Sequence, residues 1–367
     1  MTKTAMTEIA PKKCRILYHD NCLDGVVAAA AAGYFVAMEK GGNGVLRNDV
    51  LRGIENLVEF TPVEYRLEKN HAEGKGSDPA DLAKGYETVL VVDFSFSRDT
   101  IKRMCAHGGR IVVIDHHIGA VAQLGIENAD GSVSKAPGMP ANFEFVFDIK
   151  ESGASLSWEH FAKTFEGVSP SRWSGPMPRL VRLTKDYDLW KHEDADSKAL
   201  AAISRVEKWN PLEAARILID ADLLDEKIVS GRAVLKGILA NAKEIAGQAA
   251  PIRLGGIVGW AVDAPSFIAN EVADALRAQR KTGVFALYTQ RRFEDETNFK
   301  VSLRGSAGVD VRAIAEKLGG GGHKAASSFE TTPGDIGRML EGFDLTSKLD
   351  AKIEDGIEER VVSMRRP

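Results

Sequence analysis

The amino-acid sequence predicts an α/β protein whose N-terminal domain is a doubly wound, mainly parallel sheet. Residues 15 to about 190 alternate between strand-like and helix-like patterns, which is typical of such a layer. From Ser197 to Ala249 leucine and isoleucine recur at steps of three and four residues, which indicates a helical connector. A second, smaller α/β unit follows. The expected boundaries are 14–195 for the first domain, 196–250 for the connector, 251–335 for the second domain and 336–367 for a polar tail.

Short apolar runs mark the strands of the first domain, and turn residues mark its helix starts. The last predicted strand has four consecutive β-branched residues, as in a strand buried on both faces of a parallel sheet. Asp24-Gly25 opens an alanine-rich helix, and Leu156 to Phe165 is amphipathic. Segments 41–85 and 118–142 are rich in Gly, Pro, Asn and Asp, which indicates loops. The three predicted strands are Arg15–Tyr18, Thr88–Val92 and Ile111–Ile114.

The second domain has its own alternation of strands and helices, followed by a polar and charged tail from Glu341. The charged segment Arg292 to Asn298 is expected to be a hairpin tip. The predicted elements are strand Gly256–Val262, helix Phe267–Arg280, strands Val284–Thr289 and Phe299–Leu303, and helix Val311–Leu318.

Composition is ordinary for a soluble globular protein, with 44% apolar and 27% charged residues in 367. A net charge of −4 argues against a broad surface for duplex DNA, although a few local cations are enough for a short oligonucleotide. Cys14, Cys22 and Cys105 lack the spacing of a zinc motif, which favours a reducing compartment. No apolar segment has signal-peptide or membrane-spanning character. We therefore expect a cytoplasmic protein without a membrane partner, and leave a homodimer open.

Each predicted strand of the first domain runs into acids or imidazoles. The first leads to His19 and Asp24, the second to Asp93, and the third to Asp115, His116 and His117. Because parallel strands end at one edge of a sheet, these groups are expected to meet where open α/β sheets bind ligands. Imidazoles and carboxylates together suit Mn²⁺, Mg²⁺ or Zn²⁺. For Asp93 alone, capping of the Ser95-Phe96-Ser97 turn would be the simpler interpretation.

The ordered motifs resemble the DHH phosphoesterase superfamily over roughly residues 14 to 330. That superfamily includes RecJ-type single-strand exonucleases, nanoRNases, pAp phosphatases and cyclic-dinucleotide phosphodiesterases. A later glycine run ending in a histidine resembles its associated C-terminal substrate-binding domain. The motifs that carry the resemblance are His19…Asp24-Gly25, Asp93, Asp115-His116-His117 and Gly319-Gly320-Gly321-Gly322-His323.

The resemblance implies a centre with two metal ions, expected to be Mn²⁺ with Mg²⁺ or Zn²⁺ as alternatives. Such a pair would activate a hydroxide for attack on phosphorus and stabilise the charge that develops there. Asp93 is expected to bridge the ions, with His19 and Asp24 on one side and His117 on the other. His116 is expected near the substrate phosphate or the nucleophilic water. Asp115 would either ligate a metal or orient an imidazole.

Two ligand positions stay open in the sequence. By resemblance the fourth acid is Asp186, which a large apolar residue, Trp190, follows, with Asp188 as the alternative. Related enzymes usually carry an Asp where this chain has Cys22. Cys22 could be a soft ligand, Asp20 could replace it, or one metal could bind more weakly. An inert buried cysteine is an equally weighted alternative.

In the second domain the resemblance implies that Arg304, the four glycines Gly319 to Gly322, and His323 bind a phosphate or terminal nucleotide. The expected function is hydrolysis of short oligonucleotides, or of single-stranded RNA or DNA ends, to nucleoside monophosphates. Cyclic-dinucleotide phosphodiesterase and pAp phosphatase activity are alternatives within the same chemistry. A non-catalytic nucleotide- or RNA-binding protein is the alternative from another class.

Overall fold

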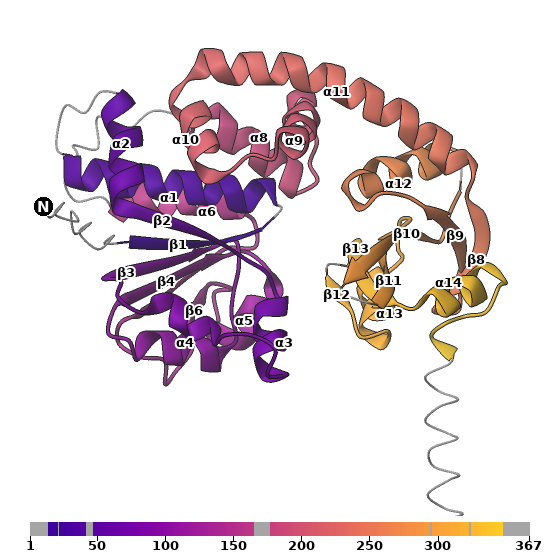
Figure 1. Cartoon of the computed structure of the whole chain (residues 1–367), viewed down its shortest axis with the longest axis horizontal. Helices are drawn as coiled ribbons and strands as arrows, with labels where there is room; N and C mark the ends of the chain where they lie inside the picture. Colours follow the sequence, from indigo (N-terminus) through magenta and orange to yellow (C-terminus); the bar gives the residue numbers. More distant parts are fainter. Residues whose placement is uncertain are drawn as a thin grey trace, which may run out of the picture. The chain divides into compact units, whose positions relative to one another are not determined.

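The computed structural model describes residues 14–20, 22–41, 47–164, 177–279, 281–293, 296–322 and 324–347. The chain divides into two compact units, Met1–Val234 and Leu235–Pro367 (Figure 1). Each unit is described by itself below.

The first unit is built on a five-stranded parallel sheet, as the sequence predicts. Its order is β2-β1-β3-β4-β7, so β1 has β2 on one side and β3 on the other. The strand order therefore reverses beside β1, which is where open α/β sheets bind their ligands. The strands are β1 Cys14–His19, β2 Val58–Val63, β3 Thr88–Val92, β4 Arg110–Asp115 and β7 Phe143–Phe147.

Helices cover both faces of this sheet (Figure 1). Successive strand residues point to opposite faces, so that Leu90 and Val112 pack in one core and Val91 and Val113 in the other. The first core lies under α1 Leu23–Gly41, α2 Arg47–Leu57, α6 Gly153–Thr164, α8 Arg179–Asp188, α9 Ala195–Glu207 and α10 Pro211–Ile219. The second core lies under α4 Arg98–Cys105 and α5 Ile118–Leu124, with α3 Arg66–Ala72 and the 3₁₀ turn Pro79–Ala83 alongside.

The loops expected at 41–85 and 118–142 contain regular structure, which corrects the sequence prediction. The first holds α2, β2 and α3, and the second holds α5 with the small hairpin of β5 Gly125–Glu127 and β6 Val133–Lys135. β2 escaped prediction because it is an edge strand that contains Pro62 and whose middle residues are half-exposed. In α2 two residues one turn apart, Val50 and Ile54, are buried, and polar residues surround them.

The segment expected to be a connector, 196–250, contributes to the core of the first unit. Residues of α9 and α10, among them Leu200 and Ile217, belong to the core of the first unit. Only α11, Ala221–Gly247, continues from the first unit into the second, because the boundary falls at Val234. The regular leucine and isoleucine spacing marked these helices but did not show what they pack against.

The second unit is a six-stranded mixed sheet in the order β12-β13-β11-β10-β9-β8. Its strands are β8 Ala250–Leu254, β9 Ile257–Asp263, β10 Val284–Phe293, β11 Glu296–Gly305, β12 Gly321–Gly322 and β13 Ala326–Thr331. Its helical elements are the 3₁₀ turn Ser266–Ile268, α12 Ala269–Ala278, α13 Val311–Lys317 and α14 Pro333–Leu340.

Part of the segment expected to be a polar tail, from residue 336, belongs to the folded second unit. Ile336, Met339 and Leu345 are buried in the core of the second unit. The local cause is a helix start, since the Thr332 hydroxyl accepts from Asp335 N and Pro333 occupies the first turn of α14.

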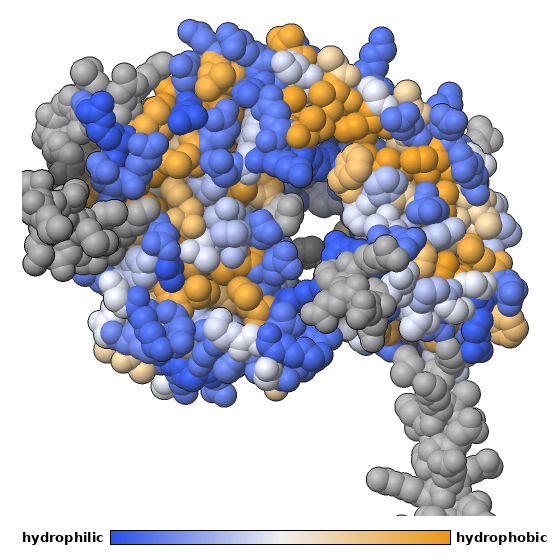
Figure 2. Space-filling model, in the orientation of Figure 1, coloured by the Kyte–Doolittle hydropathy of each residue, from blue (hydrophilic) through white to orange (hydrophobic). Residues whose placement is uncertain are grey.

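The described surface carries apolar and polar residues side by side. Figure 2 shows hydrophilic residues interspersed with apolar patches across the visible face of both units. Val229 and Leu239 of α11 are exposed apolar residues of this kind. Among the described helices none is both long enough and apolar enough to pass through a lipid bilayer.

Candidate metal centre

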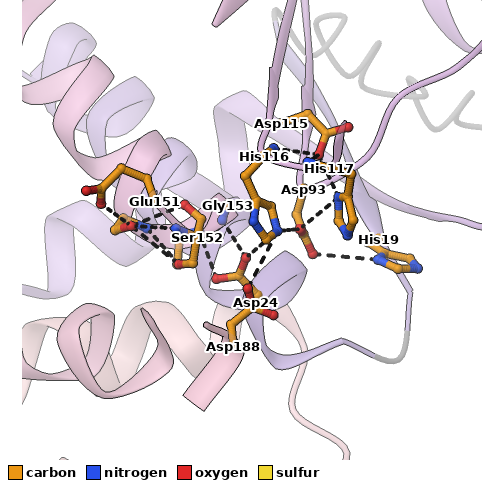
Figure 3. A network of polar contacts seen from close by, with 12 residues as sticks. His19, Asp24, Asp93, Asp115, His116, His117, Glu151, Ser152, Gly153 and Asp188 are labelled. Carbon is orange, nitrogen blue, oxygen red and sulfur yellow. Dashed lines mark hydrogen bonds and ion pairs between the residues drawn. The ribbon is translucent and has the colours of Figure 1, made fainter. Parts of the chain in front are cut away.

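Three neighbouring strands deliver the candidate ligands to one edge of the sheet (Figure 3). β1 ends at His19, Asp93 follows β3, and β4 ends at Asp115, before His116 and His117. Asp93 has a left-handed backbone with φ of 55°, and its N–H donates to Ile114 O at 2.9 Å. Aspartate tolerates this conformation better than most residues. The chain thus turns at the end of β3 and leaves the Asp93 carboxylate at the sheet edge.

The Asp93 carboxylate lies at the centre of the cluster. Its Oδ1 is 3.2 Å from His116 Nε2 and 3.9 Å from His117 Nδ1, and its Oδ2 is 3.6 Å from His19 Nδ1. His116 Nε2 also lies 3.8 Å from Asp24 Oδ2 and 3.6 Å from Asp188 Oδ2. The potential ligand atoms form three groups, each within 4.8 Å: His19–Cys22–Asp93, Asp93–His116–His117 and Asp24–His116–Asp188.

Several of these atoms are buried and make no hydrogen bond, although they lie 3.2–3.6 Å from one another. They are His19 Nδ1, both carboxylate oxygens of Asp93, and His116 Nε2. A buried polar atom left unpaired costs about 1–3 kcal/mol, so a convergent set of them is unusual unless another group belongs there. The set offers nitrogen and carboxylate oxygen, which fits a divalent transition metal.

The electrostatics of the cluster indicate a place for positive charge. Burial alone would lower the pKa of His116, but the carboxylates of Asp93, Asp24 and Asp188 raise it to about 10. Burial would also lower the pKa of His117, but the carboxylates of Asp115 and Asp93 raise it to about 9. Burial and the negative charge of Asp93 raise the pKa of Asp188 to about 6, although the nearby imidazoles lower it. Protonated imidazoles therefore balance the carboxylates, a task that a divalent cation would perform when bound.

Asp24 is fixed by a segment far away in the sequence. It lies in the first turn of α1, and its carboxylate accepts from Gly153 N and, at 3.0 Å, from Ala154 N. Those two N–H groups belong to the first turn of α6, where a helix favours negative charge. Burial, followed by the negative charges of Asp188 and Asp93, still raises the pKa of Asp24 well above its ordinary value.

Asp115 orients groups around the cluster and occurs in none of the three ligand groups. Its carboxylate accepts from Ser95 Oγ at 2.6 Å and from the backbone N–H groups of His116 and His117. Its Oδ1 also lies 2.7 Å from His117 Nδ1, the contact by which a carboxylate fixes the ring of a metal-binding histidine. Of the two roles that the sequence left open, the geometry favours orientation.

The structure brings both histidines of the motif to the cluster. His116 is 7% exposed and takes part in two of the three groups, whereas His117 takes part in one. The geometry therefore makes His116 a candidate ligand beside His117, because His116 Nε2 lies among three carboxylates.

The geometry favours Asp188, the alternative that the sequence left open, over Asp186. Asp188 belongs to the cluster, whereas the Asp186 carboxylate accepts from Glu193 N at 2.9 Å and Asp194 N at 3.3 Å. Both residues lie on α8, where positions two apart point in different directions because each residue turns the helix by about 100°. Trp190, the large apolar residue that follows the acid, is therefore two positions beyond Asp188, whereas it is four positions beyond Asp186.

Substitution of the two acids is expected to have separable effects. Asp188→Ala should weaken Mn²⁺ binding by at least about tenfold, because a candidate ligand is lost. Asp186→Ala should cost about 1–2 kcal/mol of stability through two unpaired N–H groups, with a smaller loss of Mn²⁺ affinity. Thermal unfolding and Mn²⁺ titration of both variants measure this. A larger Mn²⁺ defect in a folded Asp186→Ala would reverse the assignment.

Cys22 lies in the group with His19 and Asp93, while Asp20 lies in none of the three. Burial, together with the charges of Asp93, Asp188 and Asp24, raises the pKa of the Cys22 thiol well above its ordinary value. A metal would have to displace that proton in order to use the sulfur. The geometry thus places Cys22, rather than Asp20, among the candidate ligands.

In the second unit the glycine run and Arg304 lie on adjoining strands. Arg304 pairs with Ala326 across β11 and β13, and Gly322 pairs with Ser327 across β12 and β13. The Arg304 Nε donates to Asn270 Oδ1 at 2.8 Å. Part of the glycine run serves packing, because a Cβ at Gly320 would meet Ser328 O at 2.1 Å. Gly319 has a φ of 76° and follows α13, and Gly321 opens β12. His323 lies outside the described residues.

The chain is similar to known proteins in both of its parts. Residues 257–347 match the DHHA1 domain family. The solved DHH domain of a member of the s1p family of ribosomal proteins is 16% identical and superposes with a TM-score of 0.57, covering 90% of this chain and 85% of that one. At this identity the likeness is one of fold.

Two further relatives cover most of the chain. RecJ from Thermus thermophilus, solved in complex with Mn²⁺, is 16% identical with a TM-score of 0.47, covering 98% of this chain and 53% of that one. The uncharacterised protein R106 of Acanthamoeba polyphaga mimivirus is 21% identical over 321 residues, or 85% of this chain. The chain spans 66% of the length of that curated relative.

Proposed function

We propose that this chain, whose residues 257–347 match the DHHA1 domain family, is a DHH-type metal-dependent phosphodiesterase acting on short oligonucleotides or single-strand ends. Its products would be nucleoside monophosphates. The observation that carries the proposal is the convergence of unpaired buried atoms of His19, Asp93 and His116 at the switch point of the sheet. The DHHA1 match and the DHH-like fold support phosphoester hydrolysis, and the substrate and the metal are our inference.

The donor set offers places for two ions that share Asp93. His19, Cys22 and Asp93 would hold one, and Asp93 with the groups around His116 would hold the other. Divalent ions bound there would supply Lewis-acid stabilisation of phosphoryl oxygens and a lowered pKa for a water molecule. Mn²⁺ suits the imidazole and carboxylate donors, with Mg²⁺ as the alternative, and the Cys22 sulfur would favour Zn²⁺.

The surrounding residues would keep this donor set rigid. Asp115 holds the His117 ring, and the first turn of α6 holds Asp24, so neither side chain has to reorganise when substrate arrives. Three carboxylates around His116 Nε2 raise the pKa of this imidazole in the absence of metal. We assign to His116 either ligation or a hydrogen bond to the substrate phosphate. In the second unit Arg304 would donate to a phosphate or terminal nucleotide beside the glycine run.

A substrate panel under one Mn²⁺ condition tests the proposed function. It contains short RNA, short DNA, cyclic dinucleotides and 3′-phosphoadenosine 5′-phosphate. We expect release of nucleoside monophosphates from short linear substrates, faster than any reaction of the other two. Faster turnover of the cyclic dinucleotides or of 3′-phosphoadenosine 5′-phosphate would make that compound the assigned substrate, with the same phosphoester chemistry. Nucleotide binding without hydrolysis of any member would overturn the proposal in favour of a binding protein.

Replacement of Cys22 with serine is expected to change metal preference rather than abolish metal binding. Because thiolate is a softer ligand than a hydroxyl, Cys22→Ser should weaken Zn²⁺ binding by on the order of tenfold more than it weakens Mn²⁺ binding. Competitive chelator titrations with each ion measure this. Cys105→Ser is the matched control, since Cys105 is the last residue of α4 and is buried in the second core of the sheet, outside the three ligand groups. Unchanged affinity for both ions would identify Cys22 as an inert buried residue.

A further inference from the structure

The turn after α8 holds two bulky residues in a backbone conformation that such residues rarely adopt. Trp190 has a φ of 56° and His192 a φ of 51°. Left-handed backbone at a non-glycine residue costs on the order of 1 kcal/mol or more, and glycine or asparagine would occupy it at less cost. Trp190 is also 43% exposed, so burial of the indole does not explain why it is there.

Surrounding hydrogen bonds hold this turn in place. Trp190 N donates to Tyr187 O at 3.2 Å and Lys191 N donates to Asp186 O at 3.1 Å. The Asp186 carboxylate accepts from Glu193 N on the far side of the turn. Asp186 thus ties both ends of the strained segment together. Asp186 therefore stabilises the turn that carries Trp190.

Ring contacts restrict the indole further. The centroids of Trp190 and His192 are 5.6 Å apart in a T-shaped arrangement, and those of His192 and Tyr187 are 5.7 Å apart. One neighbouring ring covers at most one face of the indole, which agrees with the exposure of Trp190. The result is a flat aromatic side chain with restricted orientation and accessible surface.

This side chain lies next to the candidate metal centre in the chain. Trp190 is two residues beyond Asp188, whose Oδ2 is 3.6 Å from His116 Nε2. Consecutive Cα atoms are about 3.8 Å apart, so the two Cα atoms are at most about 8 Å apart. In a nucleotide a single sugar separates the base from its phosphate. The backbone of Trp190 therefore lies within about the length of one nucleotide of a residue of the phosphate-binding centre.

We propose that Trp190 is a stacking platform for the nucleobase next to the scissile phosphate, held ready by Asp186 and His192. The proposal rests on the proposed function for its phosphate-binding partner, the metal centre. Stacking on an aromatic ring tolerates every base, because each has a π-face, so the site would select nucleotides without selecting a sequence. Loss of one such contact lowers affinity roughly 5- to 150-fold.

A two-by-two comparison of protein and substrate tests the platform. Wild type and Trp190→Ala are assayed with a dinucleotide and with the same sugar-phosphate lacking its bases. For the dinucleotide we expect KM to rise roughly 5- to 150-fold with little change in kcat, and Trp190→Phe to restore most of the affinity. For the base-free substrate we expect the two proteins to behave alike. Equal losses on both substrates would identify a merely structural residue, and no loss on either would also overturn the proposal.

A binding measurement keeps the platform testable if no diester is hydrolysed. With Mg²⁺ present, a nucleoside 5′-monophosphate should quench part of the tryptophan fluorescence of the wild type. The chain has 5 tryptophans, so the wild type should lose only the part of its fluorescence that comes from Trp190. The same ligand should therefore cause no quenching in Trp190→Phe. Ribose 5-phosphate, which lacks a base, should quench in neither protein. Quenching that persists in Trp190→Phe would overturn the platform, whereas quenching that depends on Trp190 without hydrolysis would overturn only the catalytic proposal.

Discussion

Replacing Asp93 with asparagine is expected to reduce metal-dependent hydrolysis by roughly a thousandfold or more. Asp93 is 1% exposed, and its two carboxylate oxygens are the buried, unpaired acceptors that two groups of candidate ligands share. Loss of its charge would remove several kcal/mol of electrostatic stabilisation from the centre, and each 1.36 kcal/mol is tenfold in rate. Asparagine tolerates the left-handed backbone at this position, so the fold should survive.

The measurement is the rate of nucleoside monophosphate release from a short oligonucleotide with Mn²⁺. Asp99→Asn is the matched control, because it makes the same chemical change at an exposed position in the first turn of α4. It should leave the rate close to that of the wild type. Near-normal hydrolysis by Asp93→Asn would remove Asp93 from the centre.

Gly153→Ala is expected to have the second largest effect although it adds a single methyl group. A Cβ at this position would lie 2.6 Å from Asp93 Cβ and 2.9 Å from Asp24 Oδ2. Neither neighbour has room to move, because Asp93 directly follows β3 and Asp24 accepts from the backbone of α6. The clash should cost about 1–3 kcal/mol of stability and displace two candidate ligands together.

Thermal unfolding and Mn²⁺-dependent hydrolysis should therefore fall together in Gly153→Ala, with hydrolysis reduced by on the order of a hundredfold or more. Gly237→Ala is the control, since Gly237 lies inside α11 and a Cβ there would meet no heavy atom within 4 Å beyond the backbone of its own helix. At that position alanine should be neutral or stabilising by up to about 1 kcal/mol, because helix interiors favour it over glycine. Full activity in Gly153→Ala would show that α6 and the cluster can move apart to accommodate the methyl group, which would contradict the prediction.

The parts of the site that the sequence predicts are those set by local pattern. β1, β3 and β4 are short apolar runs, and parallel strands place their carboxyl ends together whatever the rest of the chain does. That is enough to gather His19, Asp93 and the motif after β4. The choice between Asp186 and Asp188 needed the end of a helix to be located within two residues, and helix ends are the least well determined by sequence.

Other features depend on contacts between segments far apart in the chain. Gly153 is visible in the sequence as part of a helix start, but its contact with Asp24 joins positions 129 residues apart. The strained backbone of Trp190 has no sequence pattern at all, since bulky residues are not expected there. The glycine run suggested a phosphate loop, yet Gly320 is also required for close approach to β13.

A titration of metal-stripped protein with Mn²⁺ tests the central claim most directly, because it requires no knowledge of the substrate. We expect saturable binding of up to two ions per chain, accompanied by proton release from the imidazoles whose pKa values lie above 7 in the metal-free state. Binding should be weakened strongly in Asp93→Asn and unchanged in Asp99→Asn. Absence of Mn²⁺ binding by the folded wild type at millimolar concentrations, or equal binding by Asp93→Asn, would contradict the account.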